Sequence, residues 1–188
     1  KPIEEVEVVS EETVEEAVEE KLTETQEGTA EEKGAEFKFI DHPTEIYPHI
    51  YCSGEVPRVT EYEDVGGNFK CEANGELIDD KLIDDGALIV DHPEGLIILS
   101  GCAHSGIINM IKHAIAITGQ SKVLAFIGGT HLIRASDERL AKTVTALREI
   151  DISQIIVSHC TGFYAAAKLY NELGSKVIKG ETGMTFKY

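Results

Sequence analysis

Apolar residues follow different patterns in the two parts of this 188-residue chain. Residues 1–36 are low in complexity and rich in glutamate. Ser10 suits the N-cap of a helix. The apolar residues after it recur at spacings of three and four, which predicts one amphipathic helix; they are Val14, Ala17, Val18 and Leu22. The composition also fits a solvated, disordered segment, so residues 1–36 are predicted to be helical or disordered.

Short extended segments dominate residues 37–100. Two of them, joined by a turn at Pro43-Thr44, are expected first, and the polar stretch over 61–86 then predicts a loop or an irregular hairpin. Two β-rich runs flank a Pro-Glu-Gly turn at 93–95, which predicts a regular β-hairpin. The second run, LIIL at 96–99, is apolar throughout, as in a strand covered on both faces.

Helical and strand patterns alternate after residue 104. The predicted order is helix 105–118, strand 122–129, helix 136–150, strand 154–160, helix 164–173 and short strands at 176–180 and 184–188. Ser136 or Asp137 is the expected N-cap of the second helix, and Gly174 is the expected C-cap of the third. This order predicts an α/β fold in which helices cover a sheet.

Three predicted strands end in small residues and a histidine, in LIILSGCAH, VLAFIGGTH and IIVSHC. The carboxyl ends of parallel strands share one edge of a sheet, so His104, His131 and His159 are expected there. Imidazole and thiolate are ligands for zinc-like ions. Cys102 lies two residues before His104 in an extended segment, so both side chains are expected to face the same side.

A single histidine after a strand is more often an ordinary polar residue than a ligand. The repetition at three strand ends favours a site role for His104 and His159, and leaves His131 evenly balanced. The remaining histidines lack this setting and are interpreted as structural; they are His42, His49, His92 and His113. Cys160 is expected to point away from His159 and to pack in the core if the strand continues through it.

Weaker signals point to an anionic ligand. Ser105 and Thr161 precede predicted helices, whose N-terminal N–H groups bind phosphate in many proteins. Arg58 and Arg134 are candidates to pair with an anionic substrate. Ordinary helix caps and exposed arginines explain the same residues equally well.

Charge and cysteine content narrow the function further. The net charge is −17, of which −11 falls in residues 1–36 as three lysines against fourteen glutamates. Phosphate contacts need Lys and Arg, so nucleic acid is not an expected partner. The four cysteines form no Cys-x-x-Cys pair, which is typical of reduced thiols in a cytoplasmic protein. No apolar run reaches the length of a membrane span, so no membrane partner is expected.

Four motifs, taken in order, resemble one branch of the metallo-β-lactamase-fold superfamily; they are SGEVPRVT, DDGALIVDHPEGLIILSGCAHSGIINMI, IGGTHL and VSHCTG. That branch includes the archaeal 7,8-dihydropterin-6-methyl-4-(β-D-ribofuranosyl)aminobenzene 5′-phosphate synthases and many proteins known only as metal-dependent hydrolases. The resemblance covers about residues 37–188 and looks like the C-terminal half of such proteins.

The resemblance implies an αββα sandwich with one or two metal ions at the sheet edge. It implies metal-binding roles for His104 and His159, places Cys102 where many relatives carry a bridging aspartate, and implies a catalytic role toward substrate for His131. The implied cofactor is a divalent metal, zinc first, with magnesium or manganese as alternatives. The superfamily's His-x-His-x-Asp-His loop and N-terminal β-half do not occur in this sequence. That half is therefore expected to be missing or to come from upstream or from another chain.

The implied function is that of a metal-dependent enzyme, either a hydrolase or a pterin–arylamine synthase of tetrahydromethanopterin-type cofactor biosynthesis. Its substrate would be an anionic small molecule such as a pterin diphosphate, contacted by Arg58, Ser105 and Thr161. Little activity is expected from this chain alone, because catalytic zinc sites use about three protein ligands per ion. The alternatives are a non-catalytic half-domain that pairs with another chain, and a binding protein for an anionic small molecule.

Overall fold

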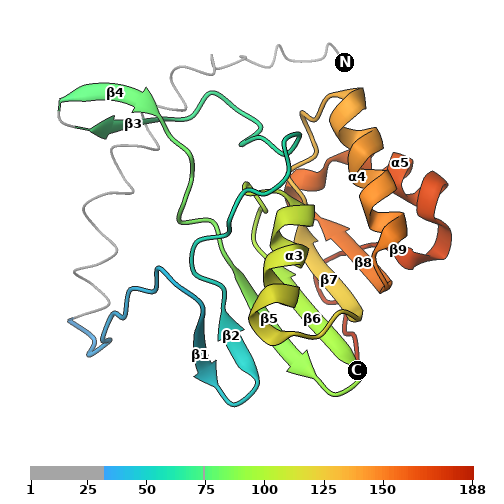
Figure 1. Ribbon diagram of the computed structural model, residues 1–188, viewed down its shortest axis with the longest axis horizontal. Helices are drawn as coiled ribbons and strands as arrows, with labels where there is room; N and C mark the ends of the chain where they lie inside the picture. The colour runs from blue at the N-terminus through green and yellow to red at the C-terminus, as the bar shows by residue number, and fades with distance from the viewer. Residues whose placement is uncertain (1–31, 74) are drawn as a thin grey trace, which may run out of the picture. The chain divides into compact units, whose positions relative to one another are not determined.

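The computed structural model describes residues 32–73 and 75–188. The chain divides into two units, Lys1–Phe39 and Ile40–Tyr188. The sequence pattern predicts this boundary after residue 36. The amphipathic helix expected to start at Ser10 lies outside the described residues. The strands and helices described below all belong to the second unit (Figure 1).

A seven-stranded sheet forms the centre of this unit, with the strand order β1-β2-β5-β6-β7-β8-β9. Its strands are β1 (Thr44–Tyr47), β2 (Ile50–Cys52), β5 (Ala87–His92), β6 (Gly95–Ser100), β7 (Val123–Gly129), β8 (Ile152–Ser158) and β9 (Val177–Lys179). Neighbours from β1 to β6 pair antiparallel, and neighbours from β6 to β9 pair parallel. The carboxyl ends of β6, β7 and β8 therefore lie at one edge, as predicted (Figure 1).

The hairpins agree with the sequence pattern except in one turn. β5 and β6 pair from Ala87↔Ser100 to His92↔Gly95, which leaves Pro93 and Glu94 as the predicted turn. β3 (Lys70–Ala73) and β4 (Glu76–Asp79) form a separate two-stranded sheet within the polar stretch expected to be irregular. The turn expected at Pro43-Thr44 is wrong, because Thr44 begins β1 and the chain reverses at His49, where φ is 65°.

Three helices follow the predicted alternation: α3 (Ile107–Thr118), α4 (Asp137–Glu149) and α5 (Phe163–Leu173). Ser136 caps α4, since its side chain accepts the N–H of Arg139. Gly174 closes α5 by donating its N–H to the carbonyl of Tyr170, as the sequence predicts. Two short 3-10 helices, η1 (His159–Thr161) and η2 (Gly174–Lys176), complete the helical elements.

Helix α3 packs against one face of the sheet, and the hydrophobic core lies between them, so helix and sheet form two layers (Figure 1). Its fully buried members include Ile89, Ile98, Phe126, Ile155, Ile107 and Ile111. Each such side chain stabilises the fold by about 1.5–3 kcal/mol relative to exposure. Leu99, on the other face of β6, is 39% exposed, so the described residues cover one face of this strand and the cover expected on the other face comes from none of them.

In the C-terminal part of the chain, the structure differs from the predicted elements in two places. β8 ends at Ser158 instead of continuing to Cys160, and residues 184–188 form no strand. The end of the chain is held instead by a side-chain contact, in which the Tyr188 hydroxyl donates to Oε1 of Gln154 at 2.8 Å. Among the described residues, no helix combines the length and the apolar character needed to cross a membrane.

Candidate functional site

The loops that follow β6, β7 and β8 each contain a residue other than glycine in the left-handed region. Ala103 has φ 57°, and His131 and His159 both have φ 47°. Each such residue costs about 1–3 kcal/mol unless the surrounding structure enforces it, and such residues cluster at functional sites. Two of the three histidines predicted at the strand ends are therefore held in a strained backbone conformation.

Glycine brings the ends of these strands into close contact. The N–H of Gly129 donates to the carbonyl of Gly101 at 3.0 Å, joining the end of β7 to the loop after β6. A Cβ added at Gly129 would lie 2.6 Å from that carbonyl oxygen and 2.7 Å from Sγ of Cys160. Because real side chains do not approach so closely, only glycine permits this packing.

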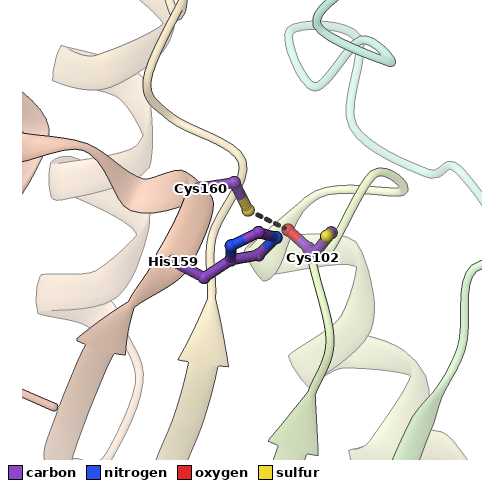
Figure 2. A group of neighbouring side chains, drawn as sticks. All are labelled: Cys102, His159 and Cys160. Carbon is purple, nitrogen blue, oxygen red and sulfur yellow. Dashed lines mark hydrogen bonds between the residues drawn. The ribbon is translucent and has the colours of Figure 1, made fainter. Parts of the chain in front are cut away.

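The same edge assembles three side chains that bind metals in proteins. Within residues 32–73 and 75–188, one atom each from Cys102, His159 and Cys160 forms a group whose members all lie within 4.8 Å of one another. Figure 2 shows the ring of His159 beside both cysteines, with the thiol of Cys160 directed at the backbone of Cys102. Sγ of Cys160 donates to the carbonyl oxygen of Cys102 at 3.2 Å.

Cys160 joins this group although the sequence pattern predicts that it points away. That expectation requires the strand to continue through the residue, but β8 ends at Ser158. His159 then adopts φ 47° and starts η1, so the alternation of side chains that holds in a strand no longer applies. The available signal was a cysteine directly beside a predicted ligand at a strand end.

The electrostatic setting of Cys160 keeps its thiol protonated. Burial, with a further contribution from the neighbouring Cys102, raises the pKa of Cys160 to about 11. At neutral pH Cys160 therefore carries its proton and makes the weak S–H bond to the backbone described above. All four cysteines, Cys52, Cys71, Cys102 and Cys160, are free thiols.

His104 lies against His131 and is not part of the cysteine group. The two imidazole centroids are 4.1 Å apart with the rings inclined at 48°, and the Phe69 ring meets His104 edge-on at 5.5 Å. Nδ1 of His104 and both ring nitrogens of His131 are buried without a hydrogen-bond partner among the described residues. These nitrogen atoms are therefore available to a ligand at the sheet edge.

Burial lowers the pKa of His131, and the nearby His104 and Arg139 lower it further. Arg139 is itself almost fully buried, and its Nη1 donates to Oδ1 of Asp64 at 2.7 Å. A neutral imidazole at His131 is consequently favoured at physiological pH. Neutral imidazole is the form that binds metals and accepts protons.

Arg58 and Ser105, two of the predicted substrate contacts, are engaged within the chain. Arg58 donates from Nη1 to the carbonyl of His104 at 2.9 Å and from Nη2 to the carbonyl of Lys81 at 2.7 Å. Ser105 donates its N–H and its hydroxyl to Oδ2 of Asp85, at 2.8 and 2.6 Å. Both residues therefore position the loop that carries His104.

The N-terminus of α3 is already occupied, so the phosphate site expected there is not open. The carboxylate of Glu63 accepts the N–H groups of Ile108 and Asn109, both at 2.9 Å. Burial raises the pKa of Glu63 even though these hydrogen bonds favour its ionised form. At the other predicted phosphate site, Thr161 is buried and its hydroxyl accepts a hydrogen bond from Thr130 at 3.0 Å.

Known proteins resemble this chain in sequence and in structure. No family model matches the chain. The sequence is 34% identical over 171 residues to a 7,8-dihydropterin-6-methyl-4-(β-D-ribofuranosyl)-aminobenzene-5′-phosphate synthase of Methanocaldococcus jannaschii, covering 89% of this chain and 58% of that protein. It is 36% identical over 137 residues to an uncharacterized protein of the same organism, covering 73% of this chain and 50% of that protein.

A solved structure described as a metal-dependent hydrolase of the β-lactamase superfamily matches with a TM-score of 0.72 and 27% identity. That match covers 81% of this chain and 58% of the other, and the chain thus spans about half or slightly more of each relative. Over the matched residues the chain is a homologue of the protein named as the archaeal synthase, and its mixed α/β fold matches that of a structure from the metallo-β-lactamase superfamily.

Proposed function

We propose that this chain belongs to a metal-dependent enzyme whose site lies at the carboxyl edge of β6, β7 and β8. The observation that carries the proposal is the group of Cys102, His159 and Cys160, whose ligand atoms lie within 4.8 Å of one another. Two members of this group, Cys102 and His159, are ligands predicted from the sequence. The structural relative described as a metal-dependent hydrolase supports the same type of site.

The residues present fit a divalent metal. Sulfur and imidazole nitrogen are the donors that zinc prefers, whereas magnesium and manganese prefer oxygen. His104, the third predicted ligand, lies outside this group beside His131, and its Nδ1 has no hydrogen-bond partner among the described residues. A bound divalent ion would act there as a Lewis acid and as a template for the substrate.

The chain's own residues would prepare the substrate. His131 is held neutral beside His104 and is therefore suited to accept a proton or a hydrogen bond from a bound molecule. Arg58 fixes the carbonyl of His104, and Ser105 is fixed by Asp85, so we assign both to positioning the site. We assign the buried Thr161, which accepts a hydrogen bond from Thr130, a structural role beside the site.

We propose an anionic small molecule as substrate, and a pterin diphosphate as the specific candidate. The support is the 34% identity to a protein named as a pterin-linked aminobenzene phosphate synthase. In that reaction class an arylamine nitrogen would attack the pterin methylene carbon and diphosphate would leave. In the hydrolase alternative, water would take the place of the arylamine.

The test is an assay of the native polypeptide that carries this sequence, with a pterin diphosphate and an arylamine phosphate. Diphosphate release that requires the arylamine identifies a synthase, and release by water alone identifies a hydrolase. His159→Ala is expected to lower both bound metal and activity at least tenfold. The control His42→Gln alters a side chain that is 77% exposed, and it should change neither. Full activity after complete metal removal would contradict the proposal.

A second candidate function is pairing through the sheet, and one observation favours it. Leu88 and Leu99 are register partners on β5 and β6, and they are 42% and 39% exposed. Contiguous apolar patches of several hundred Å² mark interaction surfaces, and these two leucines adjoin on the face of the sheet away from the core. We propose that this face packs against β-structure from another chain or from elsewhere in the same polypeptide. This role does not compete with catalysis at the sheet edge.

A binding protein for anionic small molecules is the least supported alternative. It relies on Arg58 and on helix N-termini, and these groups are engaged by backbone carbonyls and by Glu63. Binding of phosphate or pterin by metal-free protein is the observation that would favour it. We also propose a cytoplasmic location, supported by four free cysteines.

A further inference from the structure

We propose that Cys160 is a third metal ligand beside Cys102 and His159, and that this set selects a thiophilic divalent ion of the zinc class. The inference deepens the proposed metal-dependent function, on which it rests, by naming the ligands and the ion. It adds a residue that the sequence pattern assigns to packing. It also separates this group from the paired rings of His104 and His131.

The distances suit direct coordination. Zinc binds sulfur at about 2.3 Å and nitrogen at about 2.0 Å, so ligand atoms around a tetrahedral ion lie roughly 3.3–3.8 Å apart. The ligand atoms of Cys102, His159 and Cys160 lie within 4.8 Å of one another before any ion binds. The 4.8 Å limit is about 1 Å longer than the spacing around an ion, so the side chains would close by up to that distance on binding. The weak bond from Sγ of Cys160 to the carbonyl of Cys102 ends when the thiol gives its proton to solvent.

Charge and softness decide which ion fits. Two thiolates and one neutral imidazole carry a formal charge of −2, which a divalent cation neutralises. Thiolate ligands select soft or borderline ions, whereas magnesium and manganese require oxygen ligands. Neither a carboxylate nor an amide belongs to the group of three found in the described part of the chain. The donor set therefore favours zinc strongly over magnesium and manganese.

The backbone holds the three ligands in place without the ion. Cys102 lies in the loop after β6, and His159 and Cys160 lie in η1 after β8. Gly129 lies between them, and its missing side chain leaves room for Cys160, since an added Cβ would lie 2.7 Å from Sγ. His159 is fixed at φ 47°. Such preorganisation lowers the cost of ordering the ligands when metal binds.

Three protein ligands leave one position of a tetrahedral ion open, which is the arrangement of catalytic zinc sites. His159 is exposed, whereas Cys102 and Cys160 are half-buried, so the group is accessible from the side of the histidine. The open position would therefore face solvent or substrate. Two adjacent thiols have a second chemical option, which is oxidation to a disulfide, and the experiments below distinguish the two.

Cobalt(II) is the probe for the first experiment, because thiolate ligands give it an intense near-ultraviolet charge-transfer absorption. The reduced native polypeptide is titrated with cobalt(II) and then with zinc(II), with magnesium(II) in excess. We expect thiolate absorption that zinc abolishes and magnesium does not. Cys102→Ser and Cys160→Ser should each weaken cobalt binding at least tenfold and reduce this absorption. Cys71→Ser, which alters a half-buried thiol in β3 outside the group, is the matched control.

Protection of thiols in the unmutated protein gives a readout that does not depend on how the variants fold. Zinc is expected to protect Cys102 and Cys160 from alkylation, as mapped by mass spectrometry, and to leave Cys52 and Cys71 unchanged. Equal alkylation of Cys160 with and without zinc would overturn the proposal. A zinc-resistant Cys102–Cys160 disulfide in the protein isolated without reductant would overturn it as well.

The outcomes separate this inference from the proposed function. If cobalt binds without thiolate absorption, the thiolate ligand set is wrong and the metal-dependent function stands on nitrogen and oxygen ligands. If the native polypeptide binds no divalent metal, both proposals fail. Thiolate absorption in a protein that lacks activity toward pterin and ester substrates would support the site and reject the proposed reactions.

Discussion

Gly129 shows how one residue without a side chain permits a site built by others. Its N–H holds the carbonyl of Gly101 at 3.0 Å, and the absent Cβ leaves room for the thiol of Cys160. The contact partner on one side is backbone, which cannot rotate away. Any side chain at this position must therefore push the ends of β6 and β7 apart or displace Cys160.

Gly129→Ala is expected to lower the free energy of unfolding by roughly 1–3 kcal/mol, as overpacking in a close-packed region does. It should also weaken cobalt binding, because Cys160 must move away from Cys102. Urea unfolding and the cobalt titration measure the two effects. Gly101→Ala is the control at the same edge, since an added Cβ there meets no atom within 4 Å. Equal behaviour of the two variants would show that Gly129 has no special role.

The sequence predicted that Cys102 and His159 lie at strand ends, but it did not predict that Cys160 lies beside them. Strand-end histidines are visible in the sequence because apolar runs stop at glycine and histidine. The contact of Cys160 was not visible, because it depends on a left-handed conformation at His159 that ends the strand one residue earlier. The positioning role of Arg58 could not be predicted from the sequence either, because the carbonyl groups that accept its hydrogen bonds belong to His104 and Lys81, which are distant in sequence.

At the scale of single elements, α3 depends on a capping group from a distant loop. Its N-cap residue is Gly106, which has no side chain to accept a hydrogen bond. The carboxylate of Glu63 accepts N–H groups of the first turn instead. A Cβ at Gly106 would lie 2.2 Å from the carboxyl carbon of Glu63, so glycine is required for this approach. Glu63 thereby links the loop before β3 to the helix that covers the sheet.

The raised pKa of Glu63 gives stability a predictable dependence on pH. The folded protein holds a proton at Glu63 in a pH range above 4.5 where the unfolded chain has released it. The stabilising contribution of Glu63 is therefore complete at low pH and declines as pH rises through the raised pKa. The stability of the wild-type protein relative to Glu63→Gln, measured by urea unfolding, should therefore fall as the pH is raised above 4.5 through the raised pKa of Glu63.

Two further variants complete this experiment. Glu63→Ala leaves two buried N–H groups without an acceptor and should cost about 1–3 kcal/mol at every pH. Glu61→Gln changes an exposed carboxylate two positions away and should leave the pH dependence as it is in the wild type. A constant stability difference between the wild type and Glu63→Gln across the pH range would contradict the assigned protonation.

Element order was predictable from the sequence because apolar periodicity and caps are local properties. The hairpin of β5 and β6, the alternation from α3 to β9, and the caps Ser136 and Gly174 all follow from such local signals. The β1–β2 turn was misplaced because Pro43 and Pro48 lie close together and both fit a turn. The expected strand at 184–188 did not form, because β-type residues alone provide no hydrogen-bonding partner.

At the scale of the whole molecule, the sheet has one face in the core and an apolar patch on the other. Leu88 and Leu99 face outward as neighbours, and Ile127 is the register partner of Leu99 on β7. Keeping such area in water costs about 25 cal/mol per Å² relative to burying it. The apolar residues at these positions are hard to explain by the described residues alone, which supports the proposed pairing surface.

The chain of residues 1–188 is therefore expected to associate in solution through this face. Light scattering of the purified chain should give a mass above that of one chain, increasing with concentration. The double variant Leu88→Ser with Leu99→Ser should lower that mass, since it removes apolar area without touching the core. Leu77→Ser is the control, because it changes a side chain that is 76% exposed on the separate β3–β4 hairpin. If residues 1–188 with both leucines intact form a cooperative monomer at high concentration, then the face requires no cover, and its apolar character needs another cause.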